Sequence, residues 1–221
     1  NPYAHYYKDC HPNCECGRFL EIGNSVFIQY KKQKNGSLKE LSQKNVDFGG
    51  GLERLTAAVN DNPDIFESDL FNKITVSIEA ISGRIYKDPG VQAEFQIISD
   101  HLRAATFLRA SGVIPSNKLQ GYALRRLLRR SAIKLSDECF AAKDIKDIAK
   151  ISRSVIETYS DTGLLDSSLT EKIESEIKRE MDKFSKTLDH GLKEVEKIGR
   201  IDGKKAFDLY QTFGFPYEVT E

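Results

Sequence analysis

Hydrophobic and polar positions follow two different patterns along the 221 residues of this chain. Between residues 18 and 39, short runs of aromatic and β-branched residues flank a polar stretch centred on Asn35-Gly36, which predicts strand, turn and strand. A glycine triplet at 49–51 then precedes residues 52–59, where the apolar residues have helical spacing. The triplet is either a phosphate cradle at a helix N-terminus or a simple turn between strand and helix.

From about residue 62 onwards, apolar residues recur at helical spacing almost to the end of the chain. Helices are predicted over residues 122–134, 145–159 and 170–198. The last of these has an apolar stripe with near-heptad spacing, made of Ile173, Ile177, Met181, Phe184, Leu188, Leu192 and Val195. We expect this stripe to pack inside a helical core, and a coiled-coil dimer is the alternative.

Together the two patterns predict an α+β fold class, in which a small antiparallel β part is followed by a larger all-α helical domain. The change of pattern divides the chain into residues 1–62 and residues 63–221. No apolar run approaches the roughly 18 residues that a membrane span needs. The sequence therefore predicts a soluble, cytoplasmic protein without a membrane partner.

Charge is balanced over the chain but uneven locally. The 33 Lys and Arg residues cancel 33 Asp and Glu residues, which taken alone argues against a nucleic-acid partner. Residues 101–135, however, contain no carboxylate and eight basic residues: Arg103, Arg109, Lys118, Arg125, Arg126, Arg129, Arg130 and Lys134. Neutrality therefore arises by cancellation between regions, and this stretch indicates a partner that carries phosphates.

The densest part of this stretch is an arginine cluster in the predicted helix 122–134: Arg125, Arg126, Arg129 and Arg130. Helical spacing places the last three on one face with Arg125 at its border, while leucines point the other way. Such an edge suits phosphates, and Asn117 just before it is small and polar enough to reach base edges. The alternative is a solvated face that pairs with acidic residues of the next helix.

Three cysteines lie close together near the start of the chain, at Cys10, Cys14 and Cys16, and His11 follows the first. Thiolates and imidazoles are zinc ligands, but the spacing of the last two is tight for a structural site and no second half follows. Reduced cysteines in a loop are the favoured interpretation, and a zinc site is the alternative.

Five segments, in order, resemble motifs of the class II aminoacyl-tRNA synthetases, in the form found in alanyl-tRNA synthetases. Residues 46–55 (VDFGGGLERL) resemble motif 3 of that family, V/I-D-T-G-M-G-L-E-R. Residues 14–24 resemble C-x-C-x-R-F-x-E-I-W-N, and residues 99–104 resemble A-D-H-I-R-A. Residues 115–126 resemble P-S-N-x-x-x-G-Y-x-L-R-R, and residues 209–216 resemble L-Y-D-T-Y-G-F-P. Because these motifs span nearly the whole chain, the resemblance is specific.

The resemblance implies that residues 1–62 are the last part of an antiparallel catalytic domain and that residues 63–221 are a helical tRNA-recognition domain. A whole enzyme of this family activates alanine with ATP and Mg²⁺, then esterifies the terminal adenosine of tRNA(Ala). The catalytic residue implied by motif 3 is Arg54, which would contact ATP. The other implied ligand residues are Gly49 and Gly51 for ATP, and Asn24, Val26 and Asp47 for alanine.

For tRNA, the resemblance implies that a G·U wobble pair in the acceptor stem is read by an Asn and an Asp on two helical subdomains. Asn117 matches the Asn, and the arginine cluster would contact the same stem. The Asp position is occupied by Gln211, and the nearest downstream carboxylate is Glu218.

Two further departures lie near motif 3. Gly23 stands where the family has Trp, and Gly50 stands where it has Met. Loss of the Trp removes a large apolar side chain, so we expect a divergent protein or a looser alanine pocket.

The main hypothesis is therefore a fragment of an aminoacyl-tRNA ligase for alanine, which supplies motif 3 and acceptor-stem recognition. Motifs 1 and 2 would lie upstream, so we expect the isolated fragment to be inactive. One alternative is a non-catalytic tRNA-binding module from a truncated or degenerate synthetase. Another is a structural module stabilised by zinc.

Overall fold

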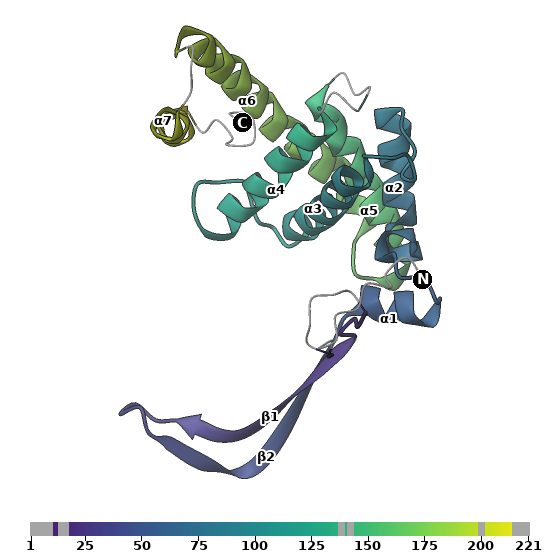
Figure 1. The fold of residues 1–221 in the computed structure, drawn as a ribbon, viewed down its shortest axis with the longest axis vertical. Helices are drawn as coiled ribbons and strands as arrows, with labels where there is room; N and C mark the ends of the chain where they lie inside the picture. The colour runs from purple at the N-terminus through teal and green to yellow at the C-terminus, as the bar shows by residue number, and fades with distance from the viewer. Residues whose placement is uncertain (1–10, 13–17, 137–139, 141–143, 199–201, 214–221) are drawn as a thin grey trace. The chain divides into compact units, whose positions relative to one another are not determined.

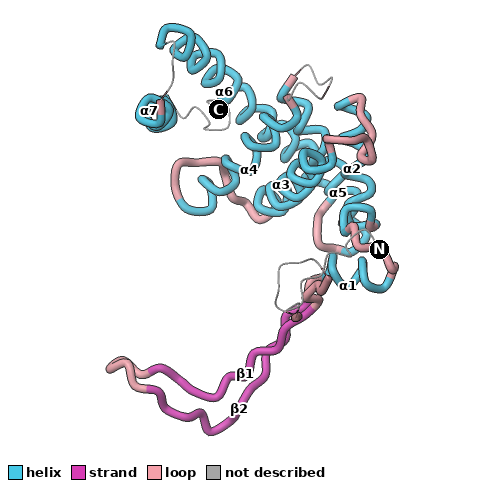
Figure 2. The backbone as a smooth tube through the Cα atoms, viewed as in Figure 1, coloured by secondary structure: helices cyan, strands magenta, loops and turns pink. Residues whose placement is uncertain are grey.

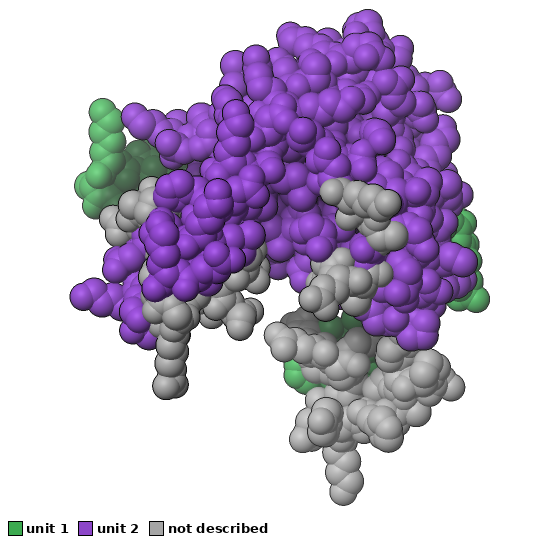
Figure 3. Space-filling view, turned by 90° about the horizontal axis from the view of Figure 1, so that it is seen from above, with its two compact units in different colours: residues 1–68 green, residues 69–221 purple. Residues whose placement is uncertain are grey.

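A computed structural model describes residues 11–12, 18–136, 140, 144–198 and 202–213. It confirms the α+β class, because a two-stranded antiparallel sheet is followed by a series of helices (Figures 1 and 2). The chain divides into two compact units, Asn1–Ser68 (unit 1) and Asp69–Glu221 (unit 2), which are coloured separately in Figure 3. The sequence boundary near residue 62 and the domain assignments on either side of it stay predictions.

Unit 1 is built on a β-hairpin. Its elements are β1 (Gly23–Lys32), β2 (Leu38–Gly50), α1 (Leu52–Val59) and the short 3-10 helix η1 (Ile65–Glu67). The turn is closed by a 2.8 Å hydrogen bond from the Gln33 amide to the Ser37 carbonyl, and Gly36 has a φ of +84°, which glycine adopts without strain. The predicted strand, turn, strand and helix are confirmed, although β1 begins only at Gly23.

Both faces of this hairpin are exposed in the described chain. The exposed large apolar residues of its strands are Val26, Phe27, Ile28, Tyr30, Leu38, Val46 and Phe48. Two strands cannot form a core by themselves, since side chains on either face find few neighbours.

Unit 2 is helical and contains the core. Its helices are α2 (Asp69–Ser82), α3 (Gln92–Ala110), α4 (Leu119–Leu135), α5 (Ile148–Tyr159), α6 (Thr170–Ile198) and α7 (Gly203–Phe213), with the 3-10 turns η2 (Ile145–Asp147), η3 (Ser160–Thr162) and η4 (Ser167–Leu169). The principal packing pairs are α3 with α4, α2 with α5 and α5 with α6. The fully buried side chains Phe95, Ile98, Leu102, Leu124 and Leu128 come from the facing helices α3 and α4.

The structure confirms the helix predicted over residues 170–198 and shows how far its apolar stripe is buried. Ile173, Ile177, Met181 and Phe184 are all buried, which agrees with packing in a helical core. Leu192, farther along the stripe, is 46% exposed. Within the described residues, no helix is both long enough and apolar enough to cross a membrane.

Candidate functional site

The register of the hairpin brings the three predicted alanine-binding residues onto one face. Asn24 lies opposite Gly49, and Val26 lies opposite Asp47. Opposed residues in an antiparallel pair share a face, and so do alternate residues along one strand. Asn24, Val26 and Asp47 are therefore neighbours on a surface that is exposed in the described chain.

The two predicted ATP-site glycines have different surroundings. A Cβ atom added to Gly49 would meet no atom within 4 Å, and the Gly49 backbone does not adopt a positive φ. Neither packing nor backbone conformation therefore requires glycine there, and the space above it is open to a ligand. A Cβ atom on Gly51 would lie 3.2 Å from Cδ of Arg54, because the stem of that arginine covers Gly51.

Arg54 is held at the start of α1. One of its terminal nitrogens, Nη1, donates a 3.0 Å hydrogen bond to the carbonyl oxygen of Glu21. The Gly51 amide donates a 3.0 Å hydrogen bond to the carbonyl oxygen of Ile22. The segment before β1 and the first turn of α1 are therefore tied together, and the exposed Arg54 guanidinium keeps donors for a phosphate or a carboxylate.

Gly23 and Gly50, the two departures from the family motifs, lie opposite each other and are covered by Phe48. A Cβ atom on Gly23 would lie 2.8 Å from Cζ of Phe48, and one on Gly50 would lie 3.2 Å from its Cε1. Strand alternation places position 23 on the face opposite Asn24. The expected loosening of the alanine pocket is therefore not supported, because the missing Trp belongs to the other face of the hairpin.

The motif at residues 115–126 forms a tight connection into α4. The Ser116 amide donates a 3.0 Å hydrogen bond to the carbonyl oxygen of Gly121, and the Ser116 hydroxyl donates to the carbonyl oxygen of Lys118 at 3.1 Å. A Cβ atom on Gly121 would overlap the Ser116 hydroxyl and lie 2.5 Å from the Ile114 carbonyl oxygen. Glycine is needed at position 121 because the loop folds back directly onto it, which leaves Asn117 exposed beside the start of α4.

The structure divides the arginine cluster into two pairs. Arg125 and Arg129 point towards α6, where Glu180 lies 3.1 Å from Nε of Arg125 and 3.0 Å from Nη2 of Arg129. Arg126 and Arg130 are exposed, and no ion pair between described residues involves either of them. The pairing with acidic residues therefore applies to the first pair, whereas the second pair forms the free basic edge.

Glu180 is buried, with 4% of its side chain exposed, and its two arginine partners are themselves only partly solvated. Burial lowers the pKa of Arg129 from its usual value, while the charge of Glu180 acts in the opposite direction. The Arg129 guanidinium also lies 4.8 Å from the ring centre of Phe184. Sequence reasoning missed Glu180, because the apolar stripe of α6 gives no sign that an acidic residue beside it faces α4.

The motif at residues 99–104 stabilises the helical core. Arg103 donates a 3.2 Å hydrogen bond from Nη1 to the Tyr159 hydroxyl, and its guanidinium lies 4.6 Å from the ring centre of Phe71. Arg103 thus connects α3 with α2 and α5.

Several candidates fall outside what the structure describes. Cys10, Cys14, Cys16 and Glu218 are not among the described residues. Gln211 lies in α7, but only its backbone is described. Within the described ranges, no three His, Cys, Asp or Glu side chains gather in a way that could hold a metal ion.

Comparison with known families agrees with this arrangement. A family model described as "tRNA synthetases class II (A)" matches residues 3–221. The chain therefore belongs to the class II tRNA synthetase family.

The curated relatives narrow the similarity to one specificity. The chain is 44% identical over 230 residues to an alanine–tRNA ligase of Borreliella afzelii, a match that covers 96% of this chain and 37% of that protein. It is 38% identical over 221 residues to an alanine–tRNA ligase of Endomicrobium trichonymphae, with 96% of this chain and 25% of that protein covered. The chain thus spans between a quarter and about two fifths of the length of these relatives.

Proposed function

We propose that this chain is part of an alanine–tRNA ligase, in which unit 1 supplies motif 3 of the catalytic domain and unit 2 binds the acceptor stem of tRNA(Ala). The observation that carries the proposal is the shared face of Asn24, Val26 and Asp47, which gathers the predicted alanine ligands from two strands. The similarity to alanine–tRNA ligases over 96% of the chain supports the same specificity. A cytoplasmic location is part of this proposal.

On the hairpin, each residue would contribute an interaction suited to its chemistry. The Asp47 carboxylate is a counter-charge for the ammonium group of alanine, and Asn24 offers donors and an acceptor to the same molecule. Val26, between them, bounds the methyl group. Because Val26 and Asp47 are directly opposed, a ligand that touches both is fixed in orientation.

ATP would bind at the junction of β2 and α1. The Arg54 guanidinium stabilises phosphate charge as a catalytic residue, and open space beside Gly49 lets a ligand approach the backbone closely. Magnesium would arrive with the ATP phosphates, since that ion is commonly held by substrate phosphates together with one or two carboxylates.

We expect no alanine-dependent ATP–pyrophosphate exchange from these 221 residues alone. Asn24, Val26 and Asp47 are all exposed in the described chain, whereas small-molecule sites bury most of the ligand surface. Exchange by the isolated chain above that of an Asp47→Asn variant would contradict this expectation.

In unit 2, the exposed Arg126 and Arg130 would contact acceptor-stem phosphates, while Asn117 reads base edges. Arg125 and Arg129 support this surface from behind through Glu180. Gln211 and Glu218 stay proposed contacts from the second helical subdomain.

The test is binding of an RNA minihelix with the tRNA(Ala) acceptor stem, carrying either G·U or G·C at the discriminating pair. We expect tighter binding of the G·U hairpin, and Asn117→Ala should reduce this preference by a larger factor than it reduces affinity for the G·C hairpin. Equal affinity for both hairpins in the unmodified chain would overturn the proposed recognition.

A further inference from the structure

Two carboxylates one turn apart on α6 are both paired with arginines of other helices. Glu176 accepts from Nη2 of Arg109 at the end of α3, and Glu180 pairs with Arg125 and Arg129 of α4. The side chains of Glu180 and Arg109 are each only 4% exposed. These pairs therefore lie between helices, where an unpaired charge would be costly.

The same arginines also hold the connection between α3 and α4, residues 111–118. Arg109 donates from Nη1 to the carbonyl oxygen of Val113, near the start of the connection. Arg125 donates from Nη1 to Oδ1 of Asn117, near its end. Each guanidinium thus touches one carboxylate of α6 and one oxygen of the connection, so α6 braces the connection at both ends.

The contact with Arg125 also fixes which way the Asn117 amide points. A guanidinium has donors and no acceptor, so only the amide oxygen can face it. The Asn117 side chain is exposed, and its Nδ2 group is then left to donate to an incoming partner. A donor held in this orientation selects acceptors on a base edge and disfavours other donors.

We propose that Glu180 is a positioning residue for tRNA discrimination: through Arg125 it holds Asn117 with its amide N–H group directed outward. Glu176 and Arg109 fix the other end of the connection in the same way. This inference rests on the proposed function, because it assigns a specificity-determining role to a residue that would not touch the RNA. It predicts that Glu180 affects the preference for G·U more than the affinity for RNA in general.

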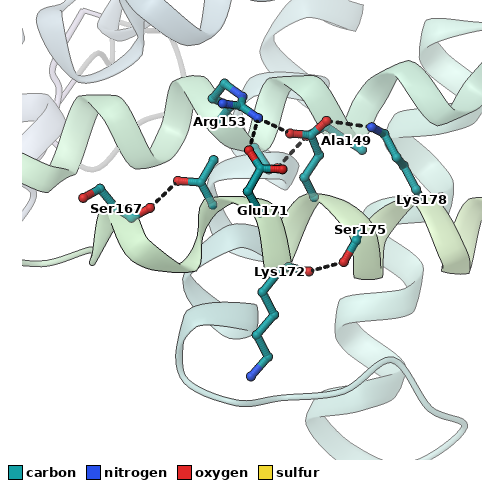
Figure 4. A network of polar contacts seen from close by, with 10 residues as sticks. Ala149, Arg153, Ser167, Glu171, Lys172, Ser175 and Lys178 are labelled. Atoms are coloured by element: carbon teal, nitrogen blue, oxygen red, sulfur yellow. Dashed lines mark hydrogen bonds and ion pairs between the residues drawn. The ribbon is translucent and has the colours of Figure 1, made fainter.

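A matched control is present on the same helix. Glu174 is also buried and also has two cationic partners, Arg153 at 2.7 Å and Lys178 at 2.7 Å, whose contacts are drawn in Figure 4. The side-chain hydrogen bonds that these two partners make within the described residues go to Glu171 and Glu174 and not to the connection. Glu174→Gln therefore removes a comparable buried carboxylate of α6 without releasing Asn117.

The first measurement needs no RNA. We expect Glu180→Gln to raise hydrogen exchange in residues 111–118 several-fold, including exchange of the Ser116 amide, while Glu174→Gln leaves this segment unchanged. Unchanged exchange in Glu180→Gln, or an equal rise in both variants, would overturn the positioning role. This readout does not depend on the proposed function.

The second measurement is the ratio of minihelix affinities for G·U and G·C. We expect Glu180→Gln to reduce this ratio about tenfold, the scale of one hydrogen bond to a charged group, and Glu174→Gln to leave it unchanged. In an Asn117→Ala background, Glu180→Gln should cause no further loss. A further loss there, or an intact ratio in the single variant, would overturn the proposal.

If Glu180→Gln shows no cooperative thermal unfolding, Arg125→Lys provides the same test. An ammonium keeps the charge opposite Glu180 but lacks the forked donors that reach both Glu180 and Asn117. We expect the same loss of the G·U preference, and an intact preference would overturn the proposal. If neither hairpin binds the unmodified chain, the proposed function fails, and the exchange measurement still decides the positioning role.

Discussion

The ring of Phe48 lies over the backbone of Gly23 on the neighbouring strand, so closely that a Cβ atom at position 23 would lie 2.8 Å from Cζ of Phe48. In the family motifs these two positions carry Thr and Trp, respectively, so the large side chain has moved from one strand to the other. Gly50 lies under the same ring. An aromatic residue that covers glycines across a strand pair compensates for their missing side chains.

Phe48→Ala should therefore loosen the end of the hairpin next to α1. Truncation uncovers the rung between Gly23 and Gly50, and we expect faster hydrogen exchange there and a loss of about 0.5–1 kcal/mol in local stability. Phe27→Ala is the matched control, because Phe27 lies on the same face with 70% exposure against 67% for Phe48, but opposite Val46 instead of a glycine. Equal effects of the two variants on this rung would contradict the compensation.

The close approach at Gly121 leads to a second prediction. Gly121→Ala places a methyl group against the Ser116 hydroxyl and the Ile114 carbonyl oxygen, so the connection must shift. Overpacking of this kind costs about 1–3 kcal/mol, measured as a change in the free energy of unfolding by urea titration. Gly203→Ala, where a Cβ atom would meet nothing within 4 Å, should stay within about 0.5 kcal/mol of the unmodified chain. Equal losses in both variants would argue against a steric cause.

The sequence was sufficient to predict the elements that depend on local patterns. The helix at 170–198 and the helix at 52–59 have the bounds that periodicity indicated, since apolar spacing alone defines them. The glycine triplet was interpreted less well. Gly49 and Gly50 belong to β2 and are paired with Asn24 and Gly23, because cross-strand hydrogen bonding outweighs the low strand propensity of glycine.

The arrangement of the arginine cluster could not be predicted from the sequence. Helical spacing grouped Arg126, Arg129 and Arg130, whereas the structure pairs Arg129 with Arg125 on Glu180. The partner comes from a helix about fifty positions away along the chain. Local periodicity contains no information about which face of α4 such a distant carboxylate meets.

The two arginine pairs should respond differently to substitution. Arg126→Ala with Arg130→Ala removes two exposed charges, so we expect weaker minihelix binding for G·U and G·C alike. The slope of log affinity against log salt concentration should become shallower by about 0.7–0.9 for each phosphate that is no longer neutralised. The free energy of unfolding should hardly change. A salt dependence that stays unchanged in the double variant would show that this edge does not bind phosphates.

Arg129→Ala should instead cost about 1–3 kcal/mol of stability, because it removes a hydrogen-bonded partner of the buried Glu180. Urea titration of this variant beside the Arg126→Ala, Arg130→Ala double variant measures the difference. Equal stability of the two would mean that Glu180 does not depend on Arg129.

Glu174 predicts a specific pH dependence of stability. Burial by itself would raise the pKa of Glu174, but hydrogen bonds from Lys178 and Arg153 hold it below its usual value of 4.5. A carboxyl group with a lower pKa in the folded state stabilises that state above its unfolded pKa, and this contribution is lost as the pH falls through the folded pKa. Glu174→Gln should therefore be less stable than the unmodified chain at pH 7, and the difference should shrink steadily below about pH 4.5. Urea titrations between pH 7 and pH 3 measure it, and contributions from other carboxyl groups cancel in the difference. A stability difference that stays constant over this range would mean that the ionised carboxylate of Glu174 is not what its two cationic partners stabilise.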